Sequence, residues 1–298
     1  RQVFKKVSEN TGIKVRLIEA TGITLIERLK REGKNSNADV ILLVDAARIN
    51  NAAKEGLLAP IQSEQIKKNV PARYRDPGNQ WFGLTRRVRA IIVNPKLVDP
   101  NSIKTYADLA NINLRGKLCL RKRKNVYNQS LVADQIVLKG QTNATNWVKN
   151  MVANVNQPFF GGDTSLIRAV GQGKCAVGVV NHYYLARMQA GASGKNDQQL
   201  TKSIKLIMPN PAHVNISAAG MAKSAKNKKE AIALITYLTS SKGSSSIAGP
   251  TYEYPLNGFG TSSQLEAFGR FNPDNVSISK LGESQKLAIQ IMANNGWR

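Results

Sequence analysis

Two adjacent tyrosines, Tyr183 and Tyr184, stand where residue type and spacing could support metal chemistry. They follow the apolar run 176–180 (AVGVV), which is typical of a strand, and they open a helical stretch. Neighbouring side chains point to opposite faces within a strand, but at a strand-to-helix turn both can face the same way. A helix N-terminus also carries positive partial charge, which favours a phenolate over a phenol. The pair could therefore bind a cation, although an ordinary aromatic strand end has the same pattern.

Binding through phenol oxygens requires the loss of a proton. A free tyrosine has a pKa near 10, so it ionises at neutral pH only when a bound cation displaces the proton. Arg187 lies four residues after Tyr183 and three after Tyr184, the spacing of neighbours on one helix face. Arg187 is thus placed to offset phenolate charge without being a ligand.

The other aromatic and histidine residues give weaker signals. Tyr74, in a polar stretch, is expected on the surface, and Tyr106 and Tyr237 are expected to be packing residues. The sequence has no GxSxG motif and no phosphate-binding loop, and its acidic residues are scattered, so no enzymatic site is predicted.

The strongly basic composition raises a second class of function. The formal net charge is +24, but the lysines and arginines are spread along the chain, and the densest cluster is the four-residue run 121–124 (RKRK). Because no nucleic-acid-binding motif accompanies this run, we interpret it as solvated surface. A nucleic-acid or surface-binding protein driven by charge alone is the alternative, and its binding would fall steeply with salt.

The chain has two cysteines, Cys119 and Cys175, in the strand-like segments 117–121 and 175–180. Without a CxxC spacing, a zinc site or a redox motif is not predicted. In an oxidising compartment the two could form one disulfide, and two buried free thiols are the alternative.

Strand-like and helical runs alternate along the chain, which predicts an α/β fold. Segments 14–18 and 39–44 read as strands, and the continuous apolar character of 39–44 is typical of a parallel sheet covered on both faces. The length of 298 residues suits two lobes. Two extended segments, near 84–93 and 207–215, contain or adjoin prolines. We expect them to be the hinge strands that join the two lobes. No apolar run is long enough to span a membrane.

The tyrosine segment, residues 173–184 (GKCAVGVVNHYY), resembles the periplasmic ferric-binding proteins of ABC importers, especially their cyanobacterial FutA-type branch. Segment 127–130 (YNQS) is the other specific match, and broader matches are 38–45 (ADVILLVD), 84–94 (LTRRVRAIIVN), 162–168 (GDTSLIR) and 248–256 (AGPTYEYPL). The resemblance implies that Tyr127, Tyr183 and Tyr184 are iron ligands. It also implies that Arg87 and Arg187 lie close to the metal.

The same resemblance implies a two-lobed periplasmic-binding-protein fold of class II, which is transferrin-like, with two hinge strands. The first lobe would comprise 1–92 and 212–262, and the second 93–211 and 263–298. Family members have a strand before the helix that opens this chain, and that strand contributes ligands. We therefore expect an N-terminally truncated chain, with at least one ligand and any export signal lying upstream.

The implied function is binding of Fe³⁺, with Fe²⁺ as an alternative, in the cleft between the lobes of a monomeric periplasmic protein. The iron would be delivered to an ABC transporter permease for uptake, without catalysis. A solute-binding protein for another small ligand, such as an anion or a polyamine, is the alternative within the same fold. No nucleic-acid partner and no membrane span are expected.

Overall fold

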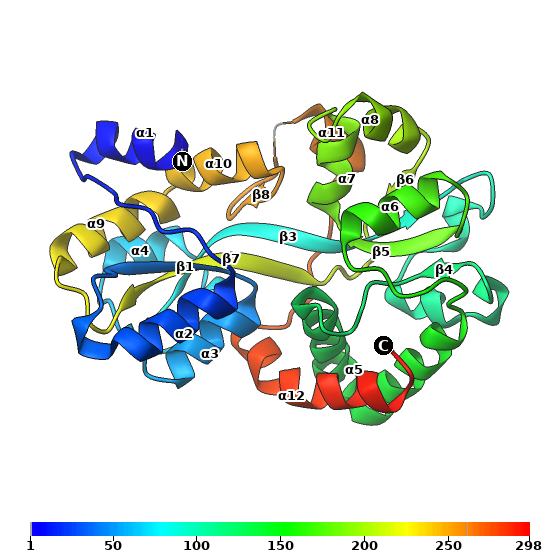
Figure 1. The fold of residues 1–298 in the computed structure, drawn as a ribbon, viewed down its shortest axis with the longest axis horizontal. Helices are drawn as coiled ribbons and strands as arrows, with labels where there is room; N and C mark the ends of the chain where they lie inside the picture. Colours follow the sequence, from blue (N-terminus) through cyan, green and yellow to red (C-terminus); the bar gives the residue numbers. More distant parts are fainter. Residues whose placement is uncertain (1, 261) are drawn as a thin grey trace. The chain divides into compact units, whose positions relative to one another are not determined.

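A computed structural model describes residues 2–260 and 262–298, which fall into two compact units (Figure 1). Unit 1 contains Arg1–Arg86, Ile216–Gly258 and Ser277–Gly282, and unit 2 contains Arg87–Asn215, Phe259–Val276 and Glu283–Arg298. The division falls inside two continuous strands, β3 (Phe82–Val93) and β7 (Val214–Ala222). Residues 277–282, which the sequence placed in the second lobe, belong to unit 1, where the Asn50 amide donates to the Ile278 and Ser279 carbonyls at 3.2 Å.

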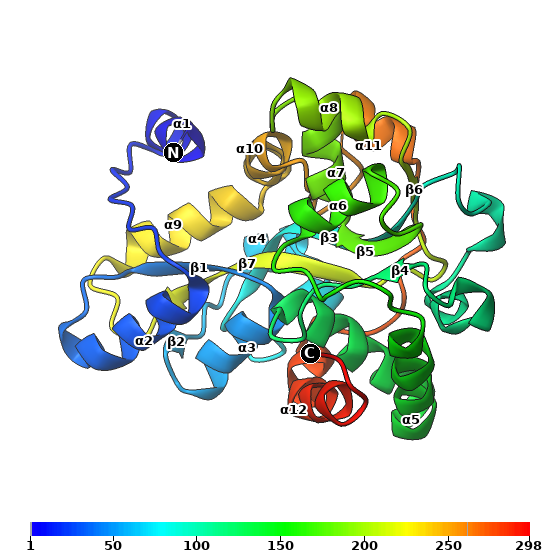
Figure 2. The ribbon, with the colours of Figure 1, turned by 45° about the vertical axis from the view of Figure 1, so that its right-hand side comes forward.

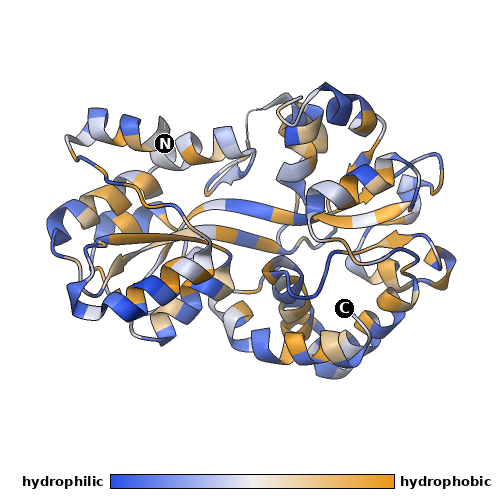
Figure 3. Cartoon of the chain, viewed as in Figure 1, coloured by the Kyte–Doolittle hydropathy of each residue, from blue (hydrophilic) through white to orange (hydrophobic). Residues whose placement is uncertain are grey.

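The sheet of unit 1 is built on β7, which pairs on its two sides with β1 (Val40–Val44) and β2 (Leu58–Ala59). The first part of β3 pairs with β8 (Tyr254–Pro255). The apolar strand expected at 39–44 is present and is largely orange in Figure 3. Its expected parallel pairing is wrong, because its partner β7 runs antiparallel. An apolar run reports burial and leaves strand direction open.

Six helices lie in unit 1, counting only described residues: α1 (Gln2–Thr11), α2 (Gly22–Glu32), α3 (Ala46–Lys54), α4 (Glu64–Asn69), α9 (Lys228–Thr239) and α10 (Ser241–Thr251). Helices α2 and α3 pack against β1. The strand expected at 14–18 is absent, and Leu17 and Ile18 are exposed. Tyr74 is buried rather than on the surface, with the Arg73 guanidinium 5.0 Å from its ring centre.

The sheet of unit 2 has the order β4–β5–β3–β6, from β4 (Leu118–Cys119), β5 (Val177–Asn181), the second part of β3, and β6 (Lys205–Ile207). Among the described pairs of named strands in this unit, only β4–β5 is parallel. Cys119 in β4 and Cys175, which lies just before β5, form a disulfide. The alternation of strands and helices in both units is the predicted α/β class.

The helices of unit 2 are α5 (Val126–Ala153, broken at Gly140), α6 (Asp163–Gly171), α7 (His182–Gln189), α8 (Lys195–Thr201), α11 (Ser263–Phe268) and most of α12 (Ile278–Asn294). Short 3₁₀ turns cover Gly33–Asn35, Ala72–Tyr74, Pro100–Ser102, Tyr106–Ala110 and Ile112–Leu114. In Figures 1 and 2, α6, α7 and α8 lie on one side of β5 and α5 lies on the other. In the described part of the chain, no helix combines the length and apolar content of a membrane crossing.

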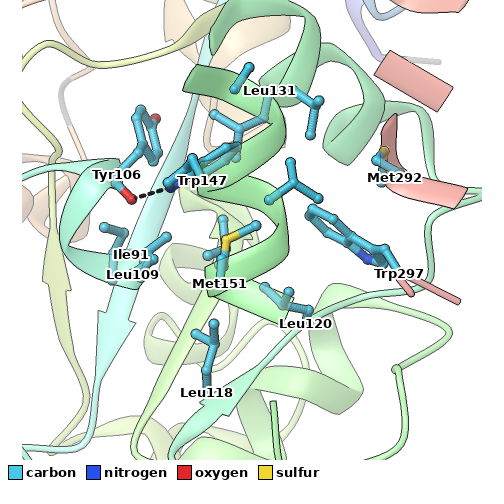
Figure 4. Packing of buried hydrophobic residues seen from close by; sticks show 14 of the residues in the cluster. Ile91, Tyr106, Leu109, Leu118, Leu120, Leu131, Trp147, Met151, Met292 and Trp297 are labelled. Atoms are coloured by element: carbon cyan, nitrogen blue, oxygen red, sulfur yellow. Dashed lines mark hydrogen bonds between the residues drawn. The ribbon is translucent and has the colours of Figure 1, made fainter. Parts of the chain in front are cut away.

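Strand β5 is held from both faces by alternating side chains. Val177 and Val179 belong to the cluster around Trp147 that Figure 4 shows, where the Trp147 indole donates to the Tyr106 carbonyl at 2.7 Å. Val180 packs into a second cluster with residues of α6 and α7. A side chain at Gly178 would collide with Leu166, 2.4 Å from the position of a Cβ atom. This packing holds β5 in place from both faces, and α7 begins directly at its end.

Candidate metal centre

Tyr183 and Tyr184 occupy the first turn of α7, directly after β5. Tyr183 is buried, with 7% of its surface exposed, and Tyr184 is partly exposed. Their ring centres are 4.5 Å apart with an interplanar angle of 32°. Both rings therefore turn the same way from the helix start, as the strand-to-helix pattern predicted.

Tyr127 joins this pair from the start of a different helix. It lies in the first turn of α5, which the Asn125 side chain caps by accepting the Tyr127 backbone N–H at 3.1 Å. The Tyr127 and Tyr183 hydroxyl oxygens are 3.5 Å apart. A small multivalent ion bonded to oxygen at roughly 2.1 Å can bridge two such atoms at an angle of about 110°. All three tyrosines open helices, whose N-terminal partial charge favours phenolates.

Without a metal ion, the phenols of Tyr183 and Tyr184 hold their protons. Burial raises the pKa of Tyr183 well above its usual value, and the nearby Tyr127 and Tyr184 phenols raise it further. Burial also raises the pKa of Tyr184, with Tyr127 adding to the effect. A cation that binds here must displace these protons, so uptake of the ion is coupled to proton release.

Three arginines surround the phenol rings. The guanidinium carbons of Arg87 and Arg121 lie 5.4 and 5.7 Å from the centre of the Tyr127 ring. The Arg187 guanidinium lies 5.8 Å from the centres of both the Tyr183 and Tyr184 rings. Guanidinium groups at this distance interact with the faces of aromatic rings and favour the charged phenolate.

Arg121 is the site residue that sequence reasoning missed. We interpreted the basic run 121–124 as solvated surface, but the Arg121 side chain is only 17% exposed and donates to Asp163 Oδ1 at 3.3 Å. The signal that could have found it was an arginine at the end of a strand-like segment, six residues before Tyr127. A run of charges by itself does not reveal which member turns inward.

The remaining aromatic and histidine residues have structural contacts. His182 is buried, and its Nδ1 accepts the Val88 backbone N–H at 3.1 Å, which ties the start of α7 to β3. The Tyr106 hydroxyl donates to the Arg89 carbonyl at 2.5 Å and accepts the His213 N–H at 3.1 Å. Neither residue is brought to the three phenol oxygens by these contacts.

A second group of potential ligand atoms lies elsewhere in unit 2. Asp134, His213 and Asp274 are buried, and one ligand atom of each lies within 4.8 Å of the others. Sequence reasoning found no carboxylate pair, because these residues are far apart in the chain. Burial and the Asp134 charge raise the pKa of Asp274 to about 6. Asp274 therefore retains its proton at mildly acidic pH.

Comparison with known proteins identifies the family. Residues 1–244 match the model of the bacterial extracellular solute-binding proteins. This chain belongs to that family. A solute-binding protein acts by binding rather than by catalysis, in agreement with the lack of an enzymatic motif in the sequence.

Several relatives of this solute-binding protein are iron proteins by name. This chain is 37% identical to iron uptake protein A1 of Synechocystis, in a match that covers all of this chain and 84% of that protein. It is 39% identical to the structure of FutA from Trichodesmium in complex with iron and citrate, with a TM-score of 0.96 over the whole chain and 95% of that structure. A ferric iron-binding protein A of Mannheimia haemolytica in an open conformation is 30% identical, with a TM-score of 0.92 over 99% of this chain and 94% of its own.

Proposed function

We propose that this solute-binding protein binds one ferric ion through the phenol oxygens of Tyr127, Tyr183 and Tyr184 and delivers it to an ABC transporter permease. The observation that carries the proposal is the approach of the Tyr127 and Tyr183 hydroxyl oxygens to 3.5 Å, beside the Tyr184 ring. Phenolate is a hard oxygen donor, and three phenolates balance the charge of a trivalent ion.

The similarity to the iron uptake and iron-bound proteins supports Fe³⁺ as the ion, and the extracellular solute-binding family supports a permease as the partner. We place the protein in the periplasm, as in the Fe(3+)-binding periplasmic protein of Serratia marcescens, 26% identical over 97% of this chain. We further propose that it acts as a monomer. A sedimentation measurement of a dimer at working concentration would contradict that part.

The test replaces each site tyrosine by phenylalanine, singly and together, and titrates ferric iron supplied with a weak chelator. We expect each single variant to lose affinity and the triple variant to lose binding, together with the visible phenolate-to-iron absorption band. Each removed phenolate takes away one charged ligand and its proton exchange.

Tyr237→Phe is the matched control. The Tyr237 hydroxyl in α9 has no hydrogen-bond partner among the described residues, so its removal should leave iron affinity unchanged. Unchanged iron affinity and an unchanged visible band in the triple variant would contradict the proposed site. Binding of an anion or polyamine without any visible band would favour the alternative solute.

A further inference from the structure

The buried carboxylate of Asp163 receives three hydrogen bonds. Asp163 opens α6, and its side chain is fully buried. Its Oδ2 accepts from Arg89 Nη1 at 2.6 Å and from the Asn181 backbone N–H at 2.9 Å. Its Oδ1 accepts from Arg121 Nη1 at 3.3 Å. Asn181 occupies the N-cap position of α7, two positions before Tyr183, so one arm of this network holds the start of the helix that carries the tyrosine pair.

The other arm leads to Tyr127. Arg89 Nη2 donates to Asn128 Oδ1 at 2.8 Å, and Asn128 directly follows Tyr127 in the first turn of α5. Asn128 Nδ2 in turn donates to the Arg121 carbonyl at 2.9 Å. The Arg121 guanidinium contacts both Asp163 and the Tyr127 ring. The network therefore closes on itself and joins the starts of α5 and α7.

We propose that Asp163 is a positioning residue of the iron site, which holds the two tyrosine-bearing helix starts together before the ion arrives. This inference rests on the proposed function. Without the carboxylate, Arg89 and Arg121 lose their shared acceptor, and the Asn181 N–H loses its partner. The Tyr127 and Tyr183 oxygens then have no fixed separation, and the incoming ion must order both helix starts as it binds. Groups that hydrogen-bond around metal ligands set affinity in this way.

The neutral, equally sized variant Asp163→Asn tests the inference. One amide oxygen can still accept from one donor, but it cannot serve both guanidinium groups and the Asn181 N–H as an anion. We expect iron affinity to fall by about 10–100-fold. We also expect the visible phenolate-to-iron band of the iron-saturated variant to shift and weaken toward that of Tyr127→Phe, because the Arg121 guanidinium beside the Tyr127 ring has lost its carboxylate acceptor.

Asp197→Asn is the control, since Asp197 in α8 also pairs with an arginine, Arg168, but does so away from the tyrosines. It should leave iron affinity and the visible band unchanged. If Asp163→Asn does not fold, Arg121→Gln decides the matter, because it keeps the Arg89–Asp163 pair and removes the guanidinium that joins Asp163 to the Tyr127 ring. We expect Arg121→Gln to shift the same band and to lower affinity by a smaller factor.

Two results would overturn the inference. One is wild-type iron affinity in folded Asp163→Asn, or in Arg121→Gln if the first does not fold. The other is weaker binding with the wild-type visible band at saturation, which would indicate a general loss of stability without a change at the ion. A wild-type protein that binds no iron is a different outcome, because it contradicts the proposed function itself.

Discussion

Two buried groups of charged side chains in unit 2 balance their charges in opposite ways. Around Asp163, one carboxylate is shared by Arg89 and Arg121, and opposite charges are in contact. Around Asp134, a second carboxylate, Asp274, and a histidine come together, and the two acids repel each other. The first group is held together by the attraction of opposite charges, whereas the second is stabilised when it holds a proton. The first group also contacts the tyrosine site, because Arg121 lies against the Tyr127 ring. The contacts that hold this group together therefore also hold a proposed iron ligand in place.

The largest expected effect is the pH dependence of iron binding. The ion must displace protons from up to three phenols, two of which have raised pKa values because they are buried. The apparent affinity should therefore rise by up to about 1,000-fold per pH unit between pH 5 and 7, after correction for iron hydrolysis. Competition against a chelator of known pH dependence would measure this slope.

A variant in the group formed by Asp134, His213 and Asp274 provides a control for this prediction. Asp274→Asn should leave the slope unchanged, because its proton is not exchanged for the ion. A flat affinity across this pH range would contradict binding through phenolates. A slope that changes in Asp274→Asn would show that the two groups are not independent.

The next effect concerns stability. Arg89→Ala leaves the Asp163 carboxylate buried without its strongest partner, and removing one member of a buried ion pair costs about 3–5 kcal/mol. Urea unfolding of the metal-free protein would measure this loss. Arg168→Ala breaks the ion pair between Arg168 and Asp197. Because the Arg168 side chain is 48% exposed, this variant should lose far less free energy of unfolding. Equal losses in the two variants would contradict the special role of burial in the first group.

Asp274→Asn should have a smaller effect on the free energy of unfolding, and it should stabilise the protein where Arg89→Ala destabilises it. Burial raises the pKa of Asp274 to about 6 in the folded protein, above the value of about 3.9 in an unfolded chain. Its contribution to stability is therefore complete below pH 4 and is lost as pH rises through 6. An uncharged asparagine should raise the free energy of unfolding at pH 8 by about 3 kcal/mol, and the gain should vanish near pH 4.

Asp197→Asn is the counterpart with a lowered pKa. The hydrogen bond from Arg168 lowers the pKa of Asp197, so its contribution is present at neutral pH and is lost on acidification. The two variants should therefore move stability in opposite directions at pH 8. A loss of stability in Asp274→Asn at that pH would contradict the picture of two repelling acids.

The sequence allowed the local half of the site to be predicted. Tyr183 and Tyr184 were found because a strand, a turn and a helix start follow one another within a short segment. Tyr127 came only from the family resemblance, because nothing local reports that two segments 56 residues apart will meet. Neither charged group could be predicted from the sequence, because its members lie far apart along the chain. This applies to Asp163 and Arg89, and to Asp134, His213 and Asp274.

The errors in the fold have related causes. The strand at 39–44 was found from its apolar residues, but its antiparallel partner comes from residues 217–221, which no local pattern reveals. The segment 14–18 has the residue types of a strand, yet a strand also needs a partner, and no described residue pairs with it. Tyr74 was misplaced because its charged neighbours indicated exposure, whereas its own ring is packed inside unit 1.

The most direct test of the central claim is an anomalous difference map at the iron absorption edge from crystals of the iron-loaded protein. We predict one peak within about 2.2 Å of the phenol oxygens of Tyr127, Tyr183 and Tyr184. A peak between Asp134, His213 and Asp274 with none at the tyrosines, or a peak bonded to neither group, would contradict the account.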